Sequence, residues 1–320
     1  MTEQLDLFGA PTAAETVAPA PRSQPEQSLP AGLRLGTSSW SFPGWDGLVY
    51  AGAHPSSRLS RHGLGAYAAH PWYRTVGVDS GYHAPLPRAR LAGYAEQVPP
   101  DFRFLVKAPA LITDPFERGG GGVPRATNPG FLDPTRATEL AVAPFVEGLG
   151  SRAGVLLFQF PPLGRALAEQ PRRFAEALYR FLHRLPQGPC YAVEVRDRGL
   201  LTRDLAEALR HGGARPAHAL HPRLPDLAAQ QQCFADLPPG PVVIRWMLHA
   251  GFGYEAARRR YAPFDRLHDP DPASRAAIAR LVRAALGAGE SVYVIVNNKA
   301  EGCAPLSLEA LGAEILGGEG

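Results

Sequence analysis

The two lysines of this chain are the residues whose type and rarity most strongly suggest chemistry. The sequence holds 33 lysines and arginines together, and only Lys107 and Lys299 are lysines. Arginine serves wherever a positive charge alone is needed, whereas lysine is required for a compact ammonium group or for an amine that loses its proton. Both lysines are therefore candidate site residues. Two surface lysines that simply remain in an arginine-rich chain are the alternative.

Polar side chains lie at the ends of several short apolar runs of β-type sequence, and we expect them to converge on one pocket. Within the set, Lys107 and Arg196 would hold an anion, while Glu194 or Asp79 would act as general base. A structural ion pair between Glu194 and Arg196 is the alternative, because structural networks use the same residue types. We assign candidate catalytic roles to Lys107, Glu194 and Asp79, and candidate ligand-binding roles to Trp40, Gln159, Arg196, Arg245, Asn297 and Asn298. Trp40 would stack on a base or a sugar.

Eight such runs alternate with segments of helical length, which predicts an α/β protein with a parallel sheet. Eight repeats of strand and helix are the number that closes a (β/α)8 barrel, and barrel enzymes build their sites at the carboxyl ends of the strands. The expected strands are 33–38, 75–79, 102–107, 155–160, 191–196, 216–220, 242–246 and 292–296. The expected helices are 87–97, 136–149, 167–185, 202–211, 272–286 and 306–316. We expect a disordered tail over residues 1–30 and a single barrel over residues 31–320.

Two long connections follow expected strand ends. The first contains the run Gly119–Gly122, which lacks the strand, lysine and helix setting of a phosphate loop and is better interpreted as a flexible lid. The second contains Arg258, Arg259 and Arg260, and loops after strands seven and eight often bind phosphate in barrels. A solvated run of charge is the simpler interpretation of three consecutive arginines.

Composition narrows the class of protein further. The net charge of +3 permits contact with phosphates without requiring it, and the three cysteines form neither a paired framework nor a zinc spacing. His218 and His221 would point to opposite faces of a strand end, so we assign no metal ligands, and no particular cofactor is indicated. No apolar run is long enough to cross a bilayer, and we expect a cytoplasmic protein with no membrane partner.

Five segments together resemble the YecE-like family, whose domain has no established activity. They are residues 35–41, 102–109, 157–162 (LFQFPP), 192–196 (AVEVR) and 293–304 (YVIVNNKAEGCA). The resemblance covers almost all of the chain after residue 32 and implies a TIM-barrel fold, in agreement with the strand count.

The chain departs from the family pattern at several presumed pocket positions. Gly77 stands where glutamate is usual, His83 where tyrosine is usual, and Lys299 where aspartate is usual. Asp114 and Asp197 stand where histidine is usual, and Leu200 where tryptophan is usual. A chemistry shared by the family could therefore be altered or lost here.

The sequence Gln4, Leu5, Asp6, Leu7 and Phe8 (QLDLF) resembles the pentapeptide by which bacterial replication and repair proteins dock on the sliding clamp. In such docking, Leu7 and Phe8 fill an apolar pocket and Gln4 forms hydrogen bonds at its rim. A stray apolar patch is the alternative.

Three functional hypotheses follow. The first is a clamp-associated enzyme of DNA repair that binds nucleic acid or a phosphorylated ligand, with phosphate-ester or nucleic-acid hydrolysis as the reaction. The second is a clamp-tethered adaptor that binds without chemistry, which the departures favour. The third, an enzyme acting on sugar phosphates, follows from the barrel alone.

Overall fold

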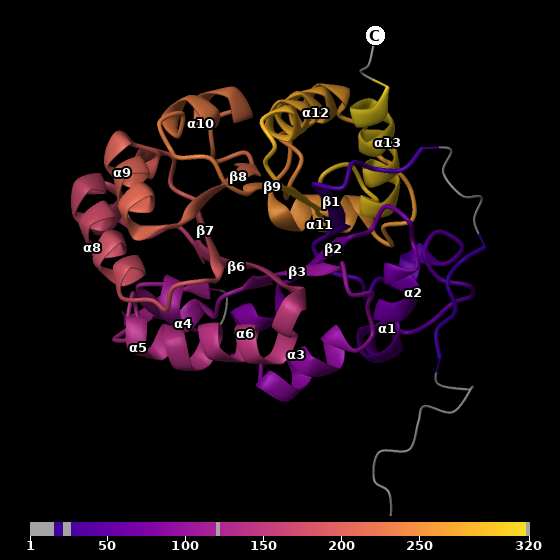
Figure 1. Cartoon of the computed structure of the whole chain (residues 1–320), viewed down its shortest axis with the longest axis horizontal. Coiled ribbons are helices and arrows are strands. Elements are labelled where there is room, and N and C mark those ends of the chain that lie inside the picture. The colour runs from indigo at the N-terminus through magenta and orange to yellow at the C-terminus, as the bar shows by residue number, and fades with distance from the viewer. Residues whose placement is uncertain (1–15, 22–26, 120–121, 318–320) are drawn as a thin grey trace, which may run out of the picture.

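The computed structural model describes residues 16–21, 27–119 and 122–317. Eight parallel strands form one sheet in the order β1-β10-β9-β8-β7-β6-β3-β2, and helices surround it (Figure 1). The strands are β1 (Leu33–Thr37), β2 (Thr75–Val78), β3 (Arg103–Lys107), β6 (Ala153–Phe160), β7 (Cys190–Val195), β8 (Arg215–Leu220), β9 (Val242–Trp246) and β10 (Val292–Val296). This confirms the predicted α/β barrel and all eight expected strands.

The strands are buried on both faces, as parallel strands covered by helices must be. Every residue of β2, β9 and β10 is buried. Inward-facing side chains fill the interior of the barrel, and they are Leu105, Val155, Leu157, Ala192, Ala217, Val243, Tyr293 and Ile295. The interior is thus a packed core, and a ligand can enter only at an end.

The barrel is nearly closed, and its seam lies between β1 and β2. The backbone N–H of Arg74 donates to the carbonyl of Leu35 at 3.1 Å, and the backbone of Gly36 passes so close to β2 that a Cβ there would lie 1.9 Å from the carbonyl oxygen of Thr75. Only glycine fits at that approach. The hydroxyl of Tyr67 accepts from the N–H of Thr37 at 2.8 Å and donates to the carbonyl of Thr75 at 3.1 Å, so it joins the two strands.

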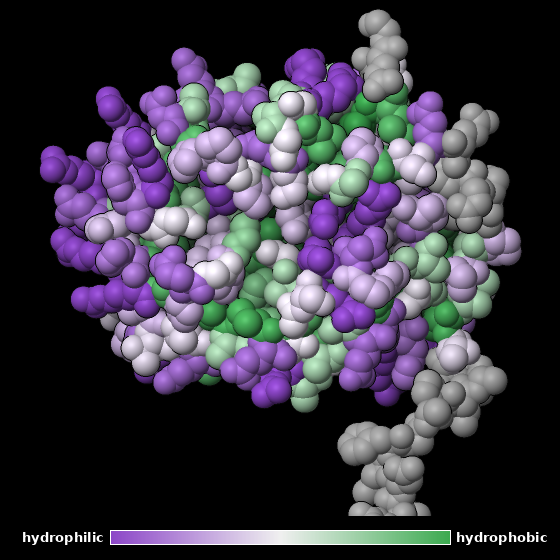
Figure 2. All heavy atoms as spheres, in the orientation of Figure 1, coloured by the Kyte–Doolittle hydropathy of each residue, from purple (hydrophilic) through white to green (hydrophobic). Residues whose placement is uncertain are grey.

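Helices follow most strands and pack their apolar stripes on the barrel. Those that correspond to the expected helices are α3 (Arg88–Ala95), α6 (Ala143–Leu149), α8 (Pro171–His183), α9 (Arg203–Gly212), α12 (Pro272–Gly287) and α13 (Ala304–Leu316). Two expected helices begin at local start signals, since Thr202 caps α9 through the N–H of Leu205 and Pro272 is the first residue of α12. Figure 2 shows hydrophilic residues gathered along the outer edge that α8 and α9 form.

Several short elements were not expected from the sequence. They are the helices α1 (Ser56–His62), α2 (Leu64–Ala68), α4 (Ala110–Thr113), α5 (Pro134–Ala137), α7 (Arg165–Ala168), α10 (Leu227–Cys233) and α11 (Tyr254–Tyr261), and the hairpin of β4 (Phe116–Arg118) and β5 (Pro124–Thr127). A π-helical turn (Thr138–Val142) links α5 to α6. Within the described residues, none of the helices combines the length and apolar character that a membrane crossing requires.

Part of the N-terminal segment differs from the expected disordered tail. Val17 and Ala20 are buried, and the N–H of Ala20 donates to the carbonyl of Val49 at 2.9 Å. Leu29 is also buried in the main core. The polar composition of this segment hid a few apolar residues that pack on the barrel. The docking peptide, residues 4–8, lies outside the described residues.

Candidate functional site

A cavity of about 320 Å³ lies where the parallel strands end. Its lining residues lie at, or a few residues beyond, the carboxyl ends of the strands. They are Asp79, Tyr82, His83, Lys107, Gln159, Arg196, His221, Arg245, Met247, Leu248, Tyr254, Asn297 and Lys299. The topology places the cavity at the end of the barrel where sites of this fold are built.

Glu194 lies behind the cavity wall and holds two arginines in place. Its Oε1 lies 2.5 Å from an N–H nitrogen of Arg196, and its Oε2 accepts from Arg245 at 2.5 Å. The carboxylate is completely buried and the guanidinium of Arg245 is only 1% exposed. Burial opposes ionisation of Glu194, but the two guanidinium groups outweigh it and lower the pKa of the carboxyl group. Glu194 is therefore a fixed anion that orients Arg196 and Arg245.

Lys107 reaches the cavity from the last position of β3. Its Nζ lies 3.6 Å from the centroid of the Tyr82 ring, a cation–π contact. Burial lowers the pKa of Lys107 from its ordinary value of 10.5 to about 8, against the opposing charge of Asp79. A lysine with such a pKa is mostly charged at neutral pH but keeps a fraction of free amine.

Lys299 reaches the same cavity from the loop after β10. Its Nζ lies 4.3 Å from the centroid of the Tyr254 ring, and burial lowers its pKa to about 8 as well. The loop is fixed by Asn297, whose side chain accepts from the N–H of Lys299 at 2.9 Å and donates to the hydroxyl of Ser38 at 2.8 Å. Both lysines of the chain therefore face one cavity, as their rarity suggested.

Asp79 is the accessible carboxylate of the site. It follows β2, its side chain is 36% exposed, and its Oδ1 lies 3.4 Å from the second terminal nitrogen of Arg245. His221 follows β8, and burial together with the charge of Arg196 lowers the pKa of its ring to about 4. His221 is thus neutral near pH 7, where it can donate or accept a hydrogen bond.

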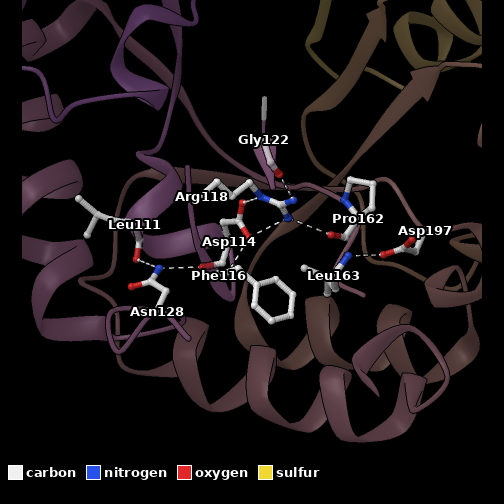
Figure 3. A network of polar contacts seen from close by, with 9 residues as sticks. All are labelled: Leu111, Asp114, Phe116, Arg118, Gly122, Asn128, Pro162, Leu163 and Asp197. Carbon is white, nitrogen blue, oxygen red and sulfur yellow. Dashed lines mark hydrogen bonds and ion pairs between the residues drawn. The ribbon is translucent and has the colours of Figure 1, made fainter. Parts of the chain in front are cut away.

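A network beside the cavity fixes the base of the β4–β5 hairpin (Figure 3). Arg118 donates to both carboxylate oxygens of Asp114, at 2.5 and 3.1 Å, and also to the carbonyls of Gly122 and Pro162. Burial and the charge of Asp114 raise the pKa of Tyr82, a lining residue, to about 12. The hairpin base therefore lies close to the cavity. Residues 120–121 lie outside the described residues, so the lid interpretation stays a prediction.

Two predicted ligand-binding residues do not line the cavity. Trp40 is 5% exposed, donates from its indole N–H to the carbonyl of Leu59 at 3.1 Å, and packs edge-on against Tyr94. It fills the core under α1 and α3 and has no free face for a base or a sugar. Asn298 is 1% exposed, and its side chain accepts from the N–H of Ala304 at the start of α13. Both are structural residues.

The other predicted residues, the arginine run and the two histidines have different positions relative to the cavity. Asp79, Lys107, Gln159, Arg196, Arg245 and Asn297 line the cavity together, whereas Glu194 supports it from behind. Of the arginine run, Arg260 pairs with Asp269 and Arg258 with Glu255, and none lines the cavity. His218 packs near Phe234 while His221 lines the cavity, and the described residues contain no group of three or more His, Cys, Asp or Glu side chains able to hold a metal ion.

Sequence reasoning missed Tyr82, Met247, Leu248 and Tyr254 as lining residues, and gave His83 and His221 no binding role. Most of these residues lie beyond the strand ends, in the short turn after β2 or the long connection after β9. Nothing in the local sequence marks the two tyrosines, because the lysines that they face lie elsewhere in the chain.

The match to a family model decides where this chain belongs. The model for the family described as "Protein of unknown function DUF72" matches residues 34–319. The chain belongs to the DUF72 family. The YecE-like resemblance noted from the sequence is thereby confirmed, and the family membership supplies no reaction.

Solved DUF72 structures share the barrel. A DUF72 protein from Enterococcus faecalis is 20% identical, with a TM-score of 0.57 over 89% of this chain and 95% of its own. A DUF72 protein from Thermotoga maritima is 22% identical, with a TM-score of 0.57 over 87% of this chain and 97% of its own. Likeness at this level shows the fold alone. No functionally curated protein matches the chain.

Proposed function

We propose that the cavity binds a small anionic ligand carrying a phosphate group. Four cationic side chains line it, from Lys107, Arg196, Arg245 and Lys299. They are opposed by two carboxylates, Asp79 on the wall and Glu194 behind it. With both lysines protonated, four positive charges against two negative leave an excess of two, which a bound anion would neutralise.

The observation that carries this proposal is the convergence of both lysines. Each amine lies over a tyrosine ring rather than on a carboxylate of the described residues. Partly buried charge without a counter-ion costs free energy, and a bound anion would remove that cost. The arginines add planar donors suited to phosphate, because each spends only part of its five N–H groups on Glu194 or Asp79.

The size of the cavity favours a nucleotide, a sugar phosphate or the terminal phosphate of a nucleic-acid strand. Ligand cavities span about 300–1,000 Å³, so this one is at the small end of the range. A duplex would have to present an end or an extruded nucleotide to reach Lys107.

If the site is catalytic, the acid–base pair is Asp79 with Lys107. Glu194, proposed from the sequence as a general base, is held between two guanidinium groups and lacks free access to a ligand. Asp79 is accessible and could take a proton from a water that attacks a phosphate ester, while the arginines stabilise the developing charge. A binding adaptor without turnover is the alternative, and it would need the same cations.

We also propose that residues 4–8 dock on the bacterial sliding clamp, which would bring the anion site to DNA. The support is the sequence QLDLF itself. A pull-down on the clamp compares the intact chain with a Leu7→Ala, Phe8→Ala variant. Equal retention of both would rule out this docking, whereas selective loss of the variant would support it.

Calorimetric titration tests the anion site with inorganic phosphate, ribose 5-phosphate and a 5′-phosphorylated oligonucleotide. We expect binding that weakens about tenfold or more in Lys299→Gln, which removes a charge from the wall. The matched control is Arg172→Gln, at an exposed arginine of α8 that does not line the cavity, and this variant should bind as the wild type does. Equal weakening in both variants, or no binding of any probe, would overturn the proposal.

A further inference from the structure

Every side-chain amine of this chain lies in the cavity. Arginine supplies the other cationic side chains, but a guanidinium group does not lose its proton at accessible pH and cannot act as a nucleophile. An amine placed among cations and aromatic rings is what an enzyme needs when lysine attacks a carbonyl group. Desolvation lowers the pKa of Lys107 to about 8, which leaves free amine available near neutral pH.

We propose that Lys107 forms an imine with a phosphate-bearing aldehyde or ketone held in the cavity. This inference rests on the proposed anion site and names the class of ligand that the site takes. The amine nitrogen attacks the carbonyl carbon, and a proton moves from nitrogen to the former carbonyl oxygen to give a carbinolamine. Loss of water from the carbinolamine then gives the carbon–nitrogen double bond. No oxidant or reductant is consumed.

Lys107 is the better placed of the two lysines. It ends β3, a strand hydrogen-bonded to β2 on one side and β6 on the other, so its backbone is fixed. Its charge interacts with that of Arg245, which would hold the phosphate, and with that of Asp79, which would move the proton. Lys299 sits in a loop against Tyr254 of α11 and lines the same cavity, where it can neutralise the phosphate.

Asp79 would carry the protons of this reaction. Its carboxylate lines the same cavity as Lys107, pairs with Arg245 at 3.4 Å and remains 36% exposed to solvent. It can accept the proton that the attacking amine loses and return it to the oxygen that leaves as water. This role needs access to both solvent and ligand, which Glu194 lacks.

Borohydride trapping tests the inference, because reduction turns the imine into a stable secondary amine. The intact chain is incubated with glyceraldehyde 3-phosphate, or with glyceraldehyde as the matched neutral compound, then reduced and mapped by mass spectrometry. Only three primary amines exist, the two lysines and the α-amine, so the site of labelling is unambiguous. We expect one adduct, at Lys107. Glyceraldehyde 3-phosphate should label this lysine at least about tenfold more than glyceraldehyde does.

Two variants control the trapping. Lys107→Arg keeps the charge and should lose the adduct, and the mapping in the wild type stands even if this variant fails to fold. Arg165→Lys places a new amine on the exposed face of α7, and that amine should stay unlabelled. Labelling of the surface amine, the α-amine or Lys299 to the same extent as Lys107, or equal labelling by glyceraldehyde, would overturn the inference.

Two further arms separate the possible outcomes. An oligonucleotide with an abasic site carries the same chemistry, an aldehyde beside phosphate, so an adduct at Lys107 with it alone would support the imine and identify nucleic acid as the source. The protein could bind inorganic phosphate by calorimetry but form no adduct at Lys107 with glyceraldehyde 3-phosphate or with the oligonucleotide. That result would overturn the proposed imine and would leave the proposed anion site standing. Failure to bind any phosphate compound would remove both proposals.

Discussion

The carboxylate of Glu194 and the guanidinium of Arg245 form a buried ion pair at 2.5 Å beneath the cavity. Two charges at such depth cost several kcal/mol each to desolvate, a cost that only close pairing offsets. Here the pair orients donors toward a cavity that carries an excess of positive charge. The role of Glu194 is thus to orient the arginines of the anion site, and it takes no part in a reaction there.

Removing the charge of Glu194 should destabilise the whole barrel. Glu194→Gln leaves Arg196 and Arg245 without their shared counter-ion, and we expect a loss of about 3–5 kcal/mol in the free energy of unfolding. Urea denaturation measures it. Glu169→Gln, which breaks an exposed pair with Arg165 on α7, should change stability by less than about 1 kcal/mol. Similar values for the two variants would contradict the role given to Glu194.

The seam of the barrel should depend on one hydroxyl group. Tyr67→Phe removes the bonds that Tyr67 makes with Thr37 on β1 and Thr75 on β2, and we expect a cost of about 1–3 kcal/mol, seen as a lower Tm. Tyr191→Phe removes a single bond to the carbonyl of Pro186 and serves as control. A loss of stability in Tyr67→Phe no larger than in this control would show that the hydroxyl does not hold the seam together.

The hairpin of β4 and β5 should loosen without Arg118. Arg118→Ala removes the donors to Asp114, Gly122 and Pro162, so amide hydrogen exchange of residues 116–118 and 125–127 should become faster while the barrel strands stay protected. Arg118→Lys keeps the charge but not the two-pronged bond to Asp114, and we expect an intermediate rate. Unchanged exchange in Arg118→Ala would show that other contacts hold the hairpin.

Both lysines should titrate far below their ordinary pKa of 10.5. Because the chain has two lysines, selective isotope labelling gives two side-chain NMR signals, and we expect midpoints of about 8 for each. The unfolded chain keeps these protons up to about pH 10.5. The contribution of these lysines to the free energy of unfolding should therefore rise with pH between about 8 and 10.5. The groups that act on Lys107 are Asp79, Arg245, Glu194 and Arg196, and those on Lys299 are Asp79, Arg258 and Glu255. Midpoints near 10.5 would mean that the amines are well solvated.

The sequence was sufficient to predict the barrel because the strands and helices are recognisable from the spacing and type of neighbouring residues. Runs such as 242–246 and 292–296 contain the β-branched residues that strands buried on both faces require, and Thr202 and Pro272 mark helix starts. The ends of these strands then indicated where polar residues meet. Most of the predicted set does line one cavity.

The errors arose where long-range packing decides the role of a residue. Trp40 and Asn298 follow strands as site residues do, but contacts with Leu59 and Ala304 turn them into structural groups. Glu194 is a carboxylate at a strand end, as a general base would be. Only the three-dimensional structure shows that it is paired with two arginines. Tyr82 and Tyr254 carry no local signal because their partners lie elsewhere in the chain.

The NMR titration of the two lysines with inorganic phosphate tests the anion site most directly. A phosphate bound between Lys107 and Lys299 would favour their charged forms, so both midpoints should rise from about 8 and both signals should shift in a saturable way. Sodium chloride at matched ionic strength controls for screening. Midpoints and shifts that respond equally to phosphate and to chloride would contradict the proposal that this cavity is an anion site.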